Sequence, residues 1–233
     1  MKKFLYIAIC AFVAASLCSC QKHLTTEGVT GITYYATITL DGDATIVHQK
    51  GTEFKDPGYS AVLNGQDVTS SVKVTSNVDT KKSGVYSVSY ACTNDDGFTS
   101  SAKRTVIVLD LQDPIEGFYL TDPASYRLNS AGAKTTYGAS YEILVTSNGD
   151  GTYSCDDMLG GYYCVRAGYG SAYAMAAVFS INADNSLTLL QSAVPGWGDA
   201  ADGLEGSYIP DGSTFSFCTD YAGMLFYINM TKE

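Results

Sequence analysis

The sequence has little of what most catalytic and nucleic-acid-binding sites need. Histidine occurs only twice, tryptophan only once, and charged residues make up 16% of the chain, well below the usual quarter or so. Two histidines leave little basis for His-dependent catalysis or for a zinc site. The 14 basic residues are outnumbered by 24 acidic ones, which gives a formal net charge of −10. Such an acidic chain has no basic patch to neutralise phosphates, so no nucleic-acid partner is expected.

The local motifs of common enzymes are missing as well. The chain contains no Gly-x-Ser-x-Gly, no phosphate-binding loop, no His-Glu-x-x-His and no Cys-x-x-Cys. The adjacent Asp156 and Asp157 would point to opposite sides of a strand, so they do not form a carboxylate pair. We therefore expect no catalytic residues, no cofactor and no metal site, and a protein that is not an enzyme.

The first twenty residues have the pattern of a signal peptide. Lys2 and Lys3 precede an apolar run at 4–17, which at about 14 residues is short for a transmembrane helix of about 20. The run ends in Leu17-Cys18-Ser19-Cys20, which resembles a bacterial lipobox. This resemblance implies a signal peptide at 1–19, lipidation of Cys20 and an outer-membrane location by a lipid anchor. The alternative is an ordinary secretory signal with incidental cysteines.

Residues 20–33 follow as the lipidated cysteine and a tether that is rich in Thr and Gly. Strand-like segments of alternating polarity then recur over 34–110, separated by turn signals such as Asn64-Gly65. These segments are 34–40, 44–48, 71–76, 85–93 and 103–109. Several short strands at this spacing predict an all-β domain of the sandwich type.

Part of this domain resembles a bacterial surface Ig-like repeat. The resemblance lies in GTEFKDPGYSAV at 51–62, in the block Val78-Asp79-Thr80 … Gly84-x-Tyr-x-Val-x-Tyr, in the turn Asp96-Gly97 and in a closing strand at 104–108. It implies a β-sandwich that serves as a spacer or adhesion module on secreted proteins, without an activity of its own. The boundary of this domain is expected at 110–114, where Pro114 holds the preceding residue in extended geometry.

Residues 114–233 are expected to form a second β domain. Strand candidates are 115–120, 141–147, 151–155, 162–167, 176–181, 186–190, 214–219 and 225–231. Hairpin turns separate them, and no amphipathic helix of 12 residues is apparent. The pattern predicts an antiparallel meander that closes into a β-barrel or sandwich. Cys155 and Cys164 flank one predicted hairpin, so they either pair or remain buried thiols, as Cys92 and Cys218 would.

The only tryptophan lies in an unusual segment, VPGWGDAADGLEGSY at 194–208. A sugar needs a flat aromatic face for its C–H groups and carboxylates that accept its hydroxyl protons. Trp197, with Asp199, Asp202 and Glu205 nearby, offers both. The alternative is that Trp197 plugs the end of the domain and that the acids are merely solvated. The apparent loop is also long, and long loops in compact domains often have a function.

A second aromatic segment, GGYYCVRAGYGSAY at 160–173, places four tyrosines around Arg166. On a strand, Tyr162 and Tyr163 would face opposite sides, so one of them could join Tyr169 and Tyr173 in an exposed platform. The alternative is structural tyrosine on both faces of a sheet. Tyr163, Tyr169 and Tyr173 are therefore candidate ligand contacts beside Trp197.

The whole layout is similar to small outer-surface lipoproteins of Bacteroides-type bacteria: a lipobox, a tether, an Ig-like domain and a β-rich domain. Some such proteins bind polysaccharide, which implies a non-catalytic surface protein with a glycan ligand. Two other hypotheses remain. The first is a protein-interaction or structural role among envelope proteins, and the second is a glycoside hydrolase that uses Asp199 with Asp202 or Glu205.

Overall fold

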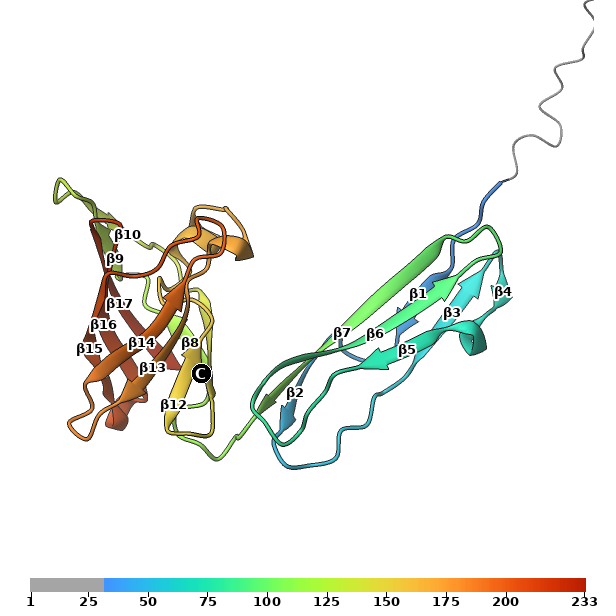
Figure 1. Cartoon of the computed structure of the whole chain (residues 1–233), viewed down its shortest axis with the longest axis horizontal. Helices are drawn as coiled ribbons and strands as arrows, with labels where there is room; N and C mark the ends of the chain where they lie inside the picture. Colours follow the sequence, from blue (N-terminus) through green and yellow to red (C-terminus); the bar gives the residue numbers. More distant parts are fainter. Residues whose placement is uncertain (1–31) are drawn as a thin grey trace, which may run out of the picture.

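The computed structural model describes residues 32–233, and the expected signal peptide, Cys20 and most of the tether lie outside them. These described residues form two groups of strands, one over 37–109 and one over 117–232 (Figure 1). They contain no α-helix, and none of their helical turns is long or apolar enough to cross a membrane. The all-β fold class is thus confirmed.

The first group consists of two sheets. One sheet has the order β1-β3-β4 and the other the order β2-β7-β6-β5, with β2 parallel to β7 and the other pairs antiparallel. Their bounds are β1 Thr37–Leu40, β2 Thr45–Gln49, β3 Tyr59–Leu63, β4 Gln66–Asp67, the 3₁₀ turn η1 Thr69–Ser71, β5 Lys73–Ser76, β6 Gly84–Thr93 and β7 Thr99–Leu109. In β6, Val88 and Tyr90 are buried as the alternation predicts.

A buried arginine connects the two sheets of this sandwich. Arg104 has no exposed surface, and its Nε lies 3.4 Å from a carboxylate oxygen of Asp56. The same guanidinium donates hydrogen bonds to the carbonyl oxygens of Asp41, Asp43 and Gly58. The Asp-Pro-Gly segment at 56–58 therefore has a structural role, because it supplies partners for a buried charge that would otherwise be costly.

The second group forms one sheet that curls on itself (Figure 1). Its main path runs β10-β9-β17-β8-β11-β12-β13-β14, and β15 and β16 continue from β17. The strands are β8 Gly117–Thr121, β9 Tyr126–Leu128, β10 Lys134–Thr136, β11 Glu142–Ser147, β12 Thr152–Cys155, β13 Ala176–Ile181, β14 Leu187–Ala193, β15 Gly203–Ile209, β16 Thr214–Tyr221 and β17 Met224–Lys232. A bridge between Ser186 and Ser207 joins the two ends of the curl.

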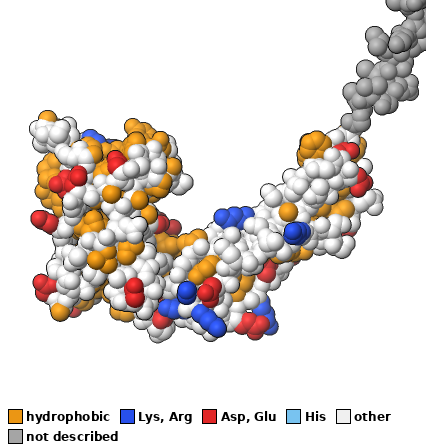
Figure 2. Space-filling view, in the orientation of Figure 1, with side chains coloured by type: hydrophobic (Ala, Val, Ile, Leu, Met, Phe, Trp, Pro, Cys, Tyr) orange, Lys and Arg blue, Asp and Glu red, His pale blue; other side chains and the backbone are white. Residues whose placement is uncertain are grey.

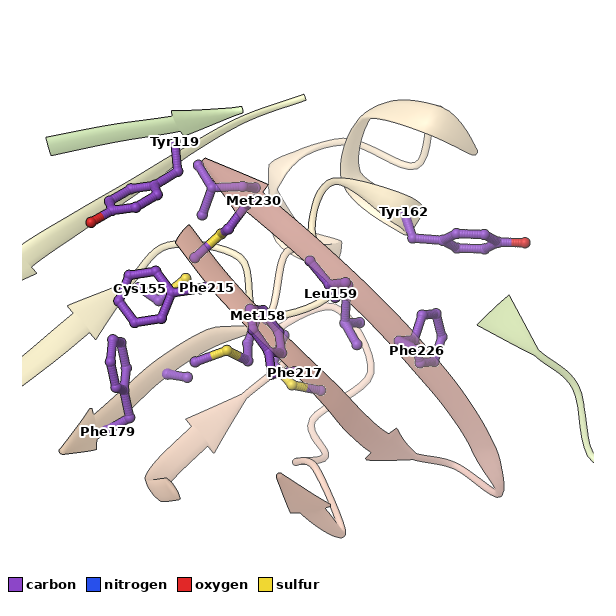
Figure 3. Packing of buried hydrophobic residues seen from close by; sticks show 14 of the residues in the cluster. Tyr119, Cys155, Met158, Leu159, Tyr162, Phe179, Phe215, Phe217, Phe226 and Met230 are labelled. Carbon is purple, nitrogen blue, oxygen red and sulfur yellow. The ribbon is translucent and has the colours of Figure 1, made fainter. Parts of the chain in front are cut away.

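Aromatic and sulfur-containing side chains fill the inside of the curl. Figure 3 shows Phe179, Phe215 and Met158 side by side, and all three are buried. The rings of Phe179 and Phe215 meet edge to face with centroids 5.6 Å apart, a favoured geometry for aromatic pairs. This core is the scaffold that holds the loops at one end of the domain.

Two sequence-based expectations are wrong in this domain, and one open alternative is decided. The segment expected as a strand at 162–167 is a short π-helix, η2 Tyr162–Arg166, followed by the 3₁₀ turns η3 Ser171–Tyr173 and, further on, η4 Pro210–Gly212. Segment 194–208 is not one long loop, because β15 begins at Gly203 and places Glu205 on a strand. Of the two alternatives for the cysteines, free thiols are found: Cys155 and Cys164 do not pair, and all four cysteines of the described chain are free, with Cys164 and Cys218 only half-buried.

The two domains meet at Glu116, a buried carboxylate just before β8. Its oxygens accept hydrogen bonds from the Ser83 hydroxyl of the first domain and from the backbone N–H groups of Asp110 and Ser147. Beside this network, Ile107 and Leu109 of β7 pack in one cluster with side chains of the second domain. The junction is therefore a built contact with both polar and apolar parts.

Candidate functional site

Trp197 stands at the tip of a tight turn, 194–199, at one end of the curled sheet. The Val194 carbonyl accepts hydrogen bonds from the N–H groups of Trp197 and Gly198, and the Val194 N–H donates to the Asp199 carbonyl. Val194 itself is fully buried, which anchors the turn to the core. Trp197 is 42% exposed, so it does not plug the domain, and the interpretation as a core residue is wrong.

A second loop presents the tyrosines next to it. In this loop Asp157 is buried and its carboxylate accepts hydrogen bonds from the N–H groups of Leu159, Gly161 and Met175. Burial raises the pKa of this carboxyl, and the three donors counteract the shift. Both ends of the loop are thereby tied to one side chain. Gly161 must lack a side chain, since a Cβ there would meet Tyr141 at 2.5 Å.

The two loops and the end of β16 form what we call the aromatic cluster: Tyr163, Tyr169, Tyr173, Trp197 and Tyr221. The Trp197 ring centroid lies 4.8 Å from that of Tyr163, 4.8 Å from that of Tyr173 and 6.1 Å from that of Tyr169. Tyr169, Tyr173 and Trp197 line an open concavity of about 270 Å³. Figure 2 shows hydrophobic side chains gathered at this end of the domain.

Some members of the aromatic cluster are buried and support it from below, and others expose their rings at its surface. Tyr163 is buried, so it lies beneath the platform rather than in it, contrary to the expectation that it would be exposed. It cannot alternate with Tyr162 across a sheet because both belong to η2, where their rings contact each other at 5.1 Å. Tyr169, with 56% of its surface exposed, and Trp197 supply the open aromatic faces.

The two predicted acids lie at the edge of this cluster. The Asp199 carboxylate accepts a hydrogen bond of 2.8 Å from the Tyr221 hydroxyl, and the Tyr221 ring lies 6.2 Å from Trp197. Burial, and then this hydrogen bond, raise the pKa of Tyr221, so the hydroxyl remains a donor at neutral pH. Asp202 accepts from the Ala222 N–H. Both carboxylates are exposed and keep further lone pairs for a ligand.

Sequence analysis did not identify two residues of this region. They are Tyr221, at the end of β16, and Arg127, on β9 beside the Tyr162 ring. Alternation along β16 does mark Tyr221 as an inward residue, but no local pattern connects it with Asp199 on another turn. Glu205, by contrast, lies on β15 opposite Cys218, away from the aromatic cluster, and lines a different groove. In the described part of the chain no three His, Cys, Asp or Glu side chains are arranged to hold a metal ion.

That other groove, of about 400 Å³, crosses the outer face of β15, β16 and β17. Its aromatic wall is Tyr126 and Tyr227, which stack on each other with centroids 4.8 Å apart. The ammonium group of Lys134 lies 3.9 Å from the centre of the Tyr126 ring. Both rings are only half-exposed, so the groove offers a ligand less free aromatic surface than the cluster around Trp197 does.

Family models match both parts of the chain. A model for the Ig-like domain of bacterial surface proteins matches residues 38–108, and a model described as a C-terminal domain matches residues 108–232. The crystal structure of the lipoprotein BT2262 from Bacteroides thetaiotaomicron shares 37% identity with the chain and a TM-score of 0.71. That alignment covers 85% of this chain and 100% of the other. No curated protein sequence matches the chain.

Two structures of Clostridium perfringens ZmpB also align. One, the M60 catalytic domain with CBM51-1 and CBM51-2, has 20% identity and a TM-score of 0.29 over 54% of this chain and 15% of that one. The other, CBM51-2 in complex with GlcNAc and INT domains, has 22% identity and a TM-score of 0.27 over 51% and 31%. At these TM-scores the likeness carries no argument about this chain.

Proposed function

Since the chain belongs to the family of the Bacteroides thetaiotaomicron lipoprotein BT2262 and carries a bacterial surface Ig-like domain, we propose that it is a lipid-anchored binding protein of the outer membrane. The anchor is Cys20, the Ig-like domain is a spacer, and the C-terminal domain binds a glycan without catalysis. The observation that carries the proposal is the concavity lined by Tyr169, Tyr173 and Trp197.

The physical case begins with the cost of exposing aromatic rings. Large rings dominate the buried cluster of this domain, yet Trp197 and Tyr169 remain about half exposed at neighbouring positions. Contiguous exposed apolar surface of this kind usually marks a binding site. A pyranose ring offers C–H groups to such a surface, and its hydroxyls need acceptors at the edge, which Asp199 and Asp202 provide.

The absence of catalysis is part of the proposal. A glycosidase needs one carboxyl group that is kept protonated and a second that faces it across the scissile bond. Asp199 is bonded to the Tyr221 hydroxyl and Asp202 to a backbone N–H, so both act as acceptors. The third acid, Glu205, lines another groove. A binding function therefore fits the acids better than hydrolysis does.

A protein ligand is the second candidate, because exposed tryptophan and tyrosine are also enriched at the centres of protein interfaces. The two candidates differ in what saturates the site. The test uses residues 21–233 without lipid, titrated with a panel of plant and host polysaccharides. Trp197 fluorescence is the readout, and its origin is unambiguous because the chain has one tryptophan.

A saturable shift with a glycan class supports the proposal, provided that Trp197→Ala removes binding in calorimetry. The matched control is Phe98→Ala, which removes a ring with 49% exposure from the Ig-like domain and should leave binding unchanged. A flat response across the panel, together with co-purification of an envelope protein that Trp197→Ala releases, would replace the glycan with a protein partner. Turnover of a glycan that Asp199→Asn abolishes would make the protein an enzyme.

A further inference from the structure

Two arginines lie beside the aromatic cluster. The guanidinium carbon of Arg127, on β9, is 4.9 Å from the centre of the Tyr162 ring, and that of Arg166, at the end of η2, is 5.0 Å from the same point. Over residues 32–233 the one ion pair within 4 Å joins Arg104 and Asp56. Arg127 and Arg166 therefore share one ring without a carboxylate partner, although acidic residues outnumber basic ones in this chain.

Arg127 is also incompletely hydrogen bonded. Its Nε is buried and has no acceptor, which makes it the one such side-chain atom in the described structure. Buried donors almost always have a partner, so an exception needs an explanation. The residue is not deeply buried as a whole, and part of its side chain reaches solvent. Because Nε itself has no accessible surface, a ligand can contact Arg127 only through the other donors of its guanidinium.

Arg166 is held in position by the chain itself. Its Nε donates a hydrogen bond of 3.1 Å to the Tyr137 carbonyl, while the side chain is otherwise exposed. The terminal NH₂ groups of the guanidinium are left for a ligand. Like charges that share a small region repel each other, and a bound anion relieves this repulsion. A guanidinium also presents its donors as a planar fork that matches a carboxylate or sulfate oxygen pair.

The arginines are connected to the proposed glycan site by direct ring contacts. Tyr162, the ring that both arginines flank, contacts Tyr163 at 5.1 Å, and Tyr163 contacts Trp197 at 4.8 Å. Asp199 is bonded to Tyr221, whose ring contacts Trp197 separately. A saccharide of a few residues on Trp197 can therefore reach the arginines within its own length, while its hydroxyls reach the acids.

We propose that the site selects acidic glycans, with Arg127 and Arg166 binding an oxyanion of the sugar. This inference rests on the proposed glycan-binding function and adds the class of ligand. The oxyanion is either the carboxylate of a uronic acid or a sulfate ester, since both have the oxygen pair that a guanidinium binds. Arg166 is the principal contact because it is exposed, and Arg127 supports it from the side of β9.

The test compares polymers that differ only in charge, with residues 21–233 and calorimetry at low salt. One arm pairs polygalacturonate with its methyl ester, and the other pairs a sulfated glycosaminoglycan with its desulfated form. We expect at least one charged polymer to bind about tenfold more tightly than its partner, which corresponds to about 1.4 kcal/mol. The difference should shrink as salt is added. The pair of polymers that shows this difference in affinity identifies the bound oxyanion as a carboxylate or a sulfate.

Variants then assign the preference to the arginines. Arg166→Gln should reduce binding of the charged polymer to about the level of the uncharged one, and Arg166→Lys should restore only part of it because the fork is lost. The control is Lys134→Gln, which removes the same charge from β10, outside the cluster. Arg127→Gln is the second variant, and circular dichroism verifies its fold.

Three outcomes separate the possibilities. Equal binding of charged and uncharged polymers, with both lost on Trp197→Ala, would overturn this inference and keep the proposed function. An equal loss for Arg166→Gln and Lys134→Gln would also overturn it, because the preference would then reflect overall charge. No binding of any polymer would overturn both proposals.

Discussion

The two domains of this protein are stabilised in different ways. In the Ig-like domain the largest cluster of fully buried apolar side chains is small: Val88, Tyr90, Val106 and Val108. Arg104, with three carbonyl acceptors on two backbone segments, completes this core. The C-terminal domain instead has one continuous apolar cluster that extends from the inside of the curl to the loops around Trp197. The comparison indicates that the first domain depends on polar connections and the second on aromatic packing, which also builds the site.

The largest effect on stability is expected when the buried side chain of Arg104 loses its charge and its hydrogen bonds. Arg104→Met should destabilise the Ig-like domain by about 3–5 kcal/mol, because Asp56 and three carbonyl groups lose a buried partner. Circular dichroism in urea should show an early transition, while the Trp197 fluorescence transition should keep its midpoint. The control is Lys103→Met on the same strand, an exposed residue expected to change stability by less than about 0.5 kcal/mol. Equal losses at 103 and 104 would contradict the polar role of Arg104.

The packing of the C-terminal domain can be tested at Gly206. A Cβ at this position would lie 2.4 Å from backbone and Cβ atoms of Phe217 on β16, so Gly206→Ala must push two paired strands apart. We expect a loss of about 3 kcal/mol, read from Trp197 fluorescence in urea. Gly223→Ala is the control, since its Cβ would meet nothing within 4 Å and only the positive φ of +69° opposes it, at about 1 kcal/mol. A cost at 206 no greater than at 223 would show that the strands have room to relax.

A smaller effect is expected at the contact between the domains. In Glu116→Gln the new NH₂ group cannot accept a hydrogen bond, so at least one of the donors Ser83, Asp110 and Ser147 loses its partner. The loss should be about 1–3 kcal/mol. If the junction couples the domains, the circular dichroism and fluorescence transitions should separate further than in the unchanged protein. Ser83→Ala, which removes one neutral donor, should separate them less; an equal separation would make the charge of Glu116 irrelevant.

The sequence indicates much of the frame of both domains. The strand candidate at 176–181 has the observed bounds of β13, and period-2 alternation locates β6 closely. The strand expected at 162–167 is wrong because its structure depends on distant groups. Gly160 and Gly161 turn the chain with positive φ. The Asp157 carboxylate also accepts a hydrogen bond from the N–H of Met175, which is 18 residues away in the sequence. Alternation along the segment carries no information about such contacts.

The sequence predicts which aromatic residues belong to the site, but it does not predict how they are arranged. Trp197, Tyr169 and Tyr173 are expected together as exposed aromatic residues, and the structure does place them around one concavity. The support from Tyr163 and the link between Asp199 and Tyr221 depend on how the sheet curls, which brings separate turns to the same end. The role of Arg127 could not be predicted from the sequence for the same reason, because it contacts Tyr162 on η2, which is distant along the chain.

The smallest expected effect concerns the pH dependence of the C-terminal domain. Burial raises the pKa of Asp156 to about 6, from an ordinary value of 3.8. Between these two values the folded state holds a proton that the unfolded state has released, so stability falls as the pH rises from about 4 through about 6. Asp156 is nevertheless an exposed residue, and screening by water limits the change to about 1 kcal/mol or less. Urea unfolding followed by Trp197 fluorescence measures it.

Asp156→Asn should flatten this dependence, because the amide oxygen can still accept the hydrogen bond from the Leu144 N–H but no longer takes up a charge. The variant should therefore match the unchanged protein near pH 4 and exceed its stability above pH 7. Asp150→Asn is the opposite case, since hydrogen bonds from Thr152 lower the pKa of the exposed Asp150. A carboxyl of this kind stabilises the fold at neutral pH and loses that contribution on acidification. If both variants changed the pH dependence of stability in the same direction, burial of Asp156 would not be its cause. The difference between the two domains would then have to be explained by packing alone.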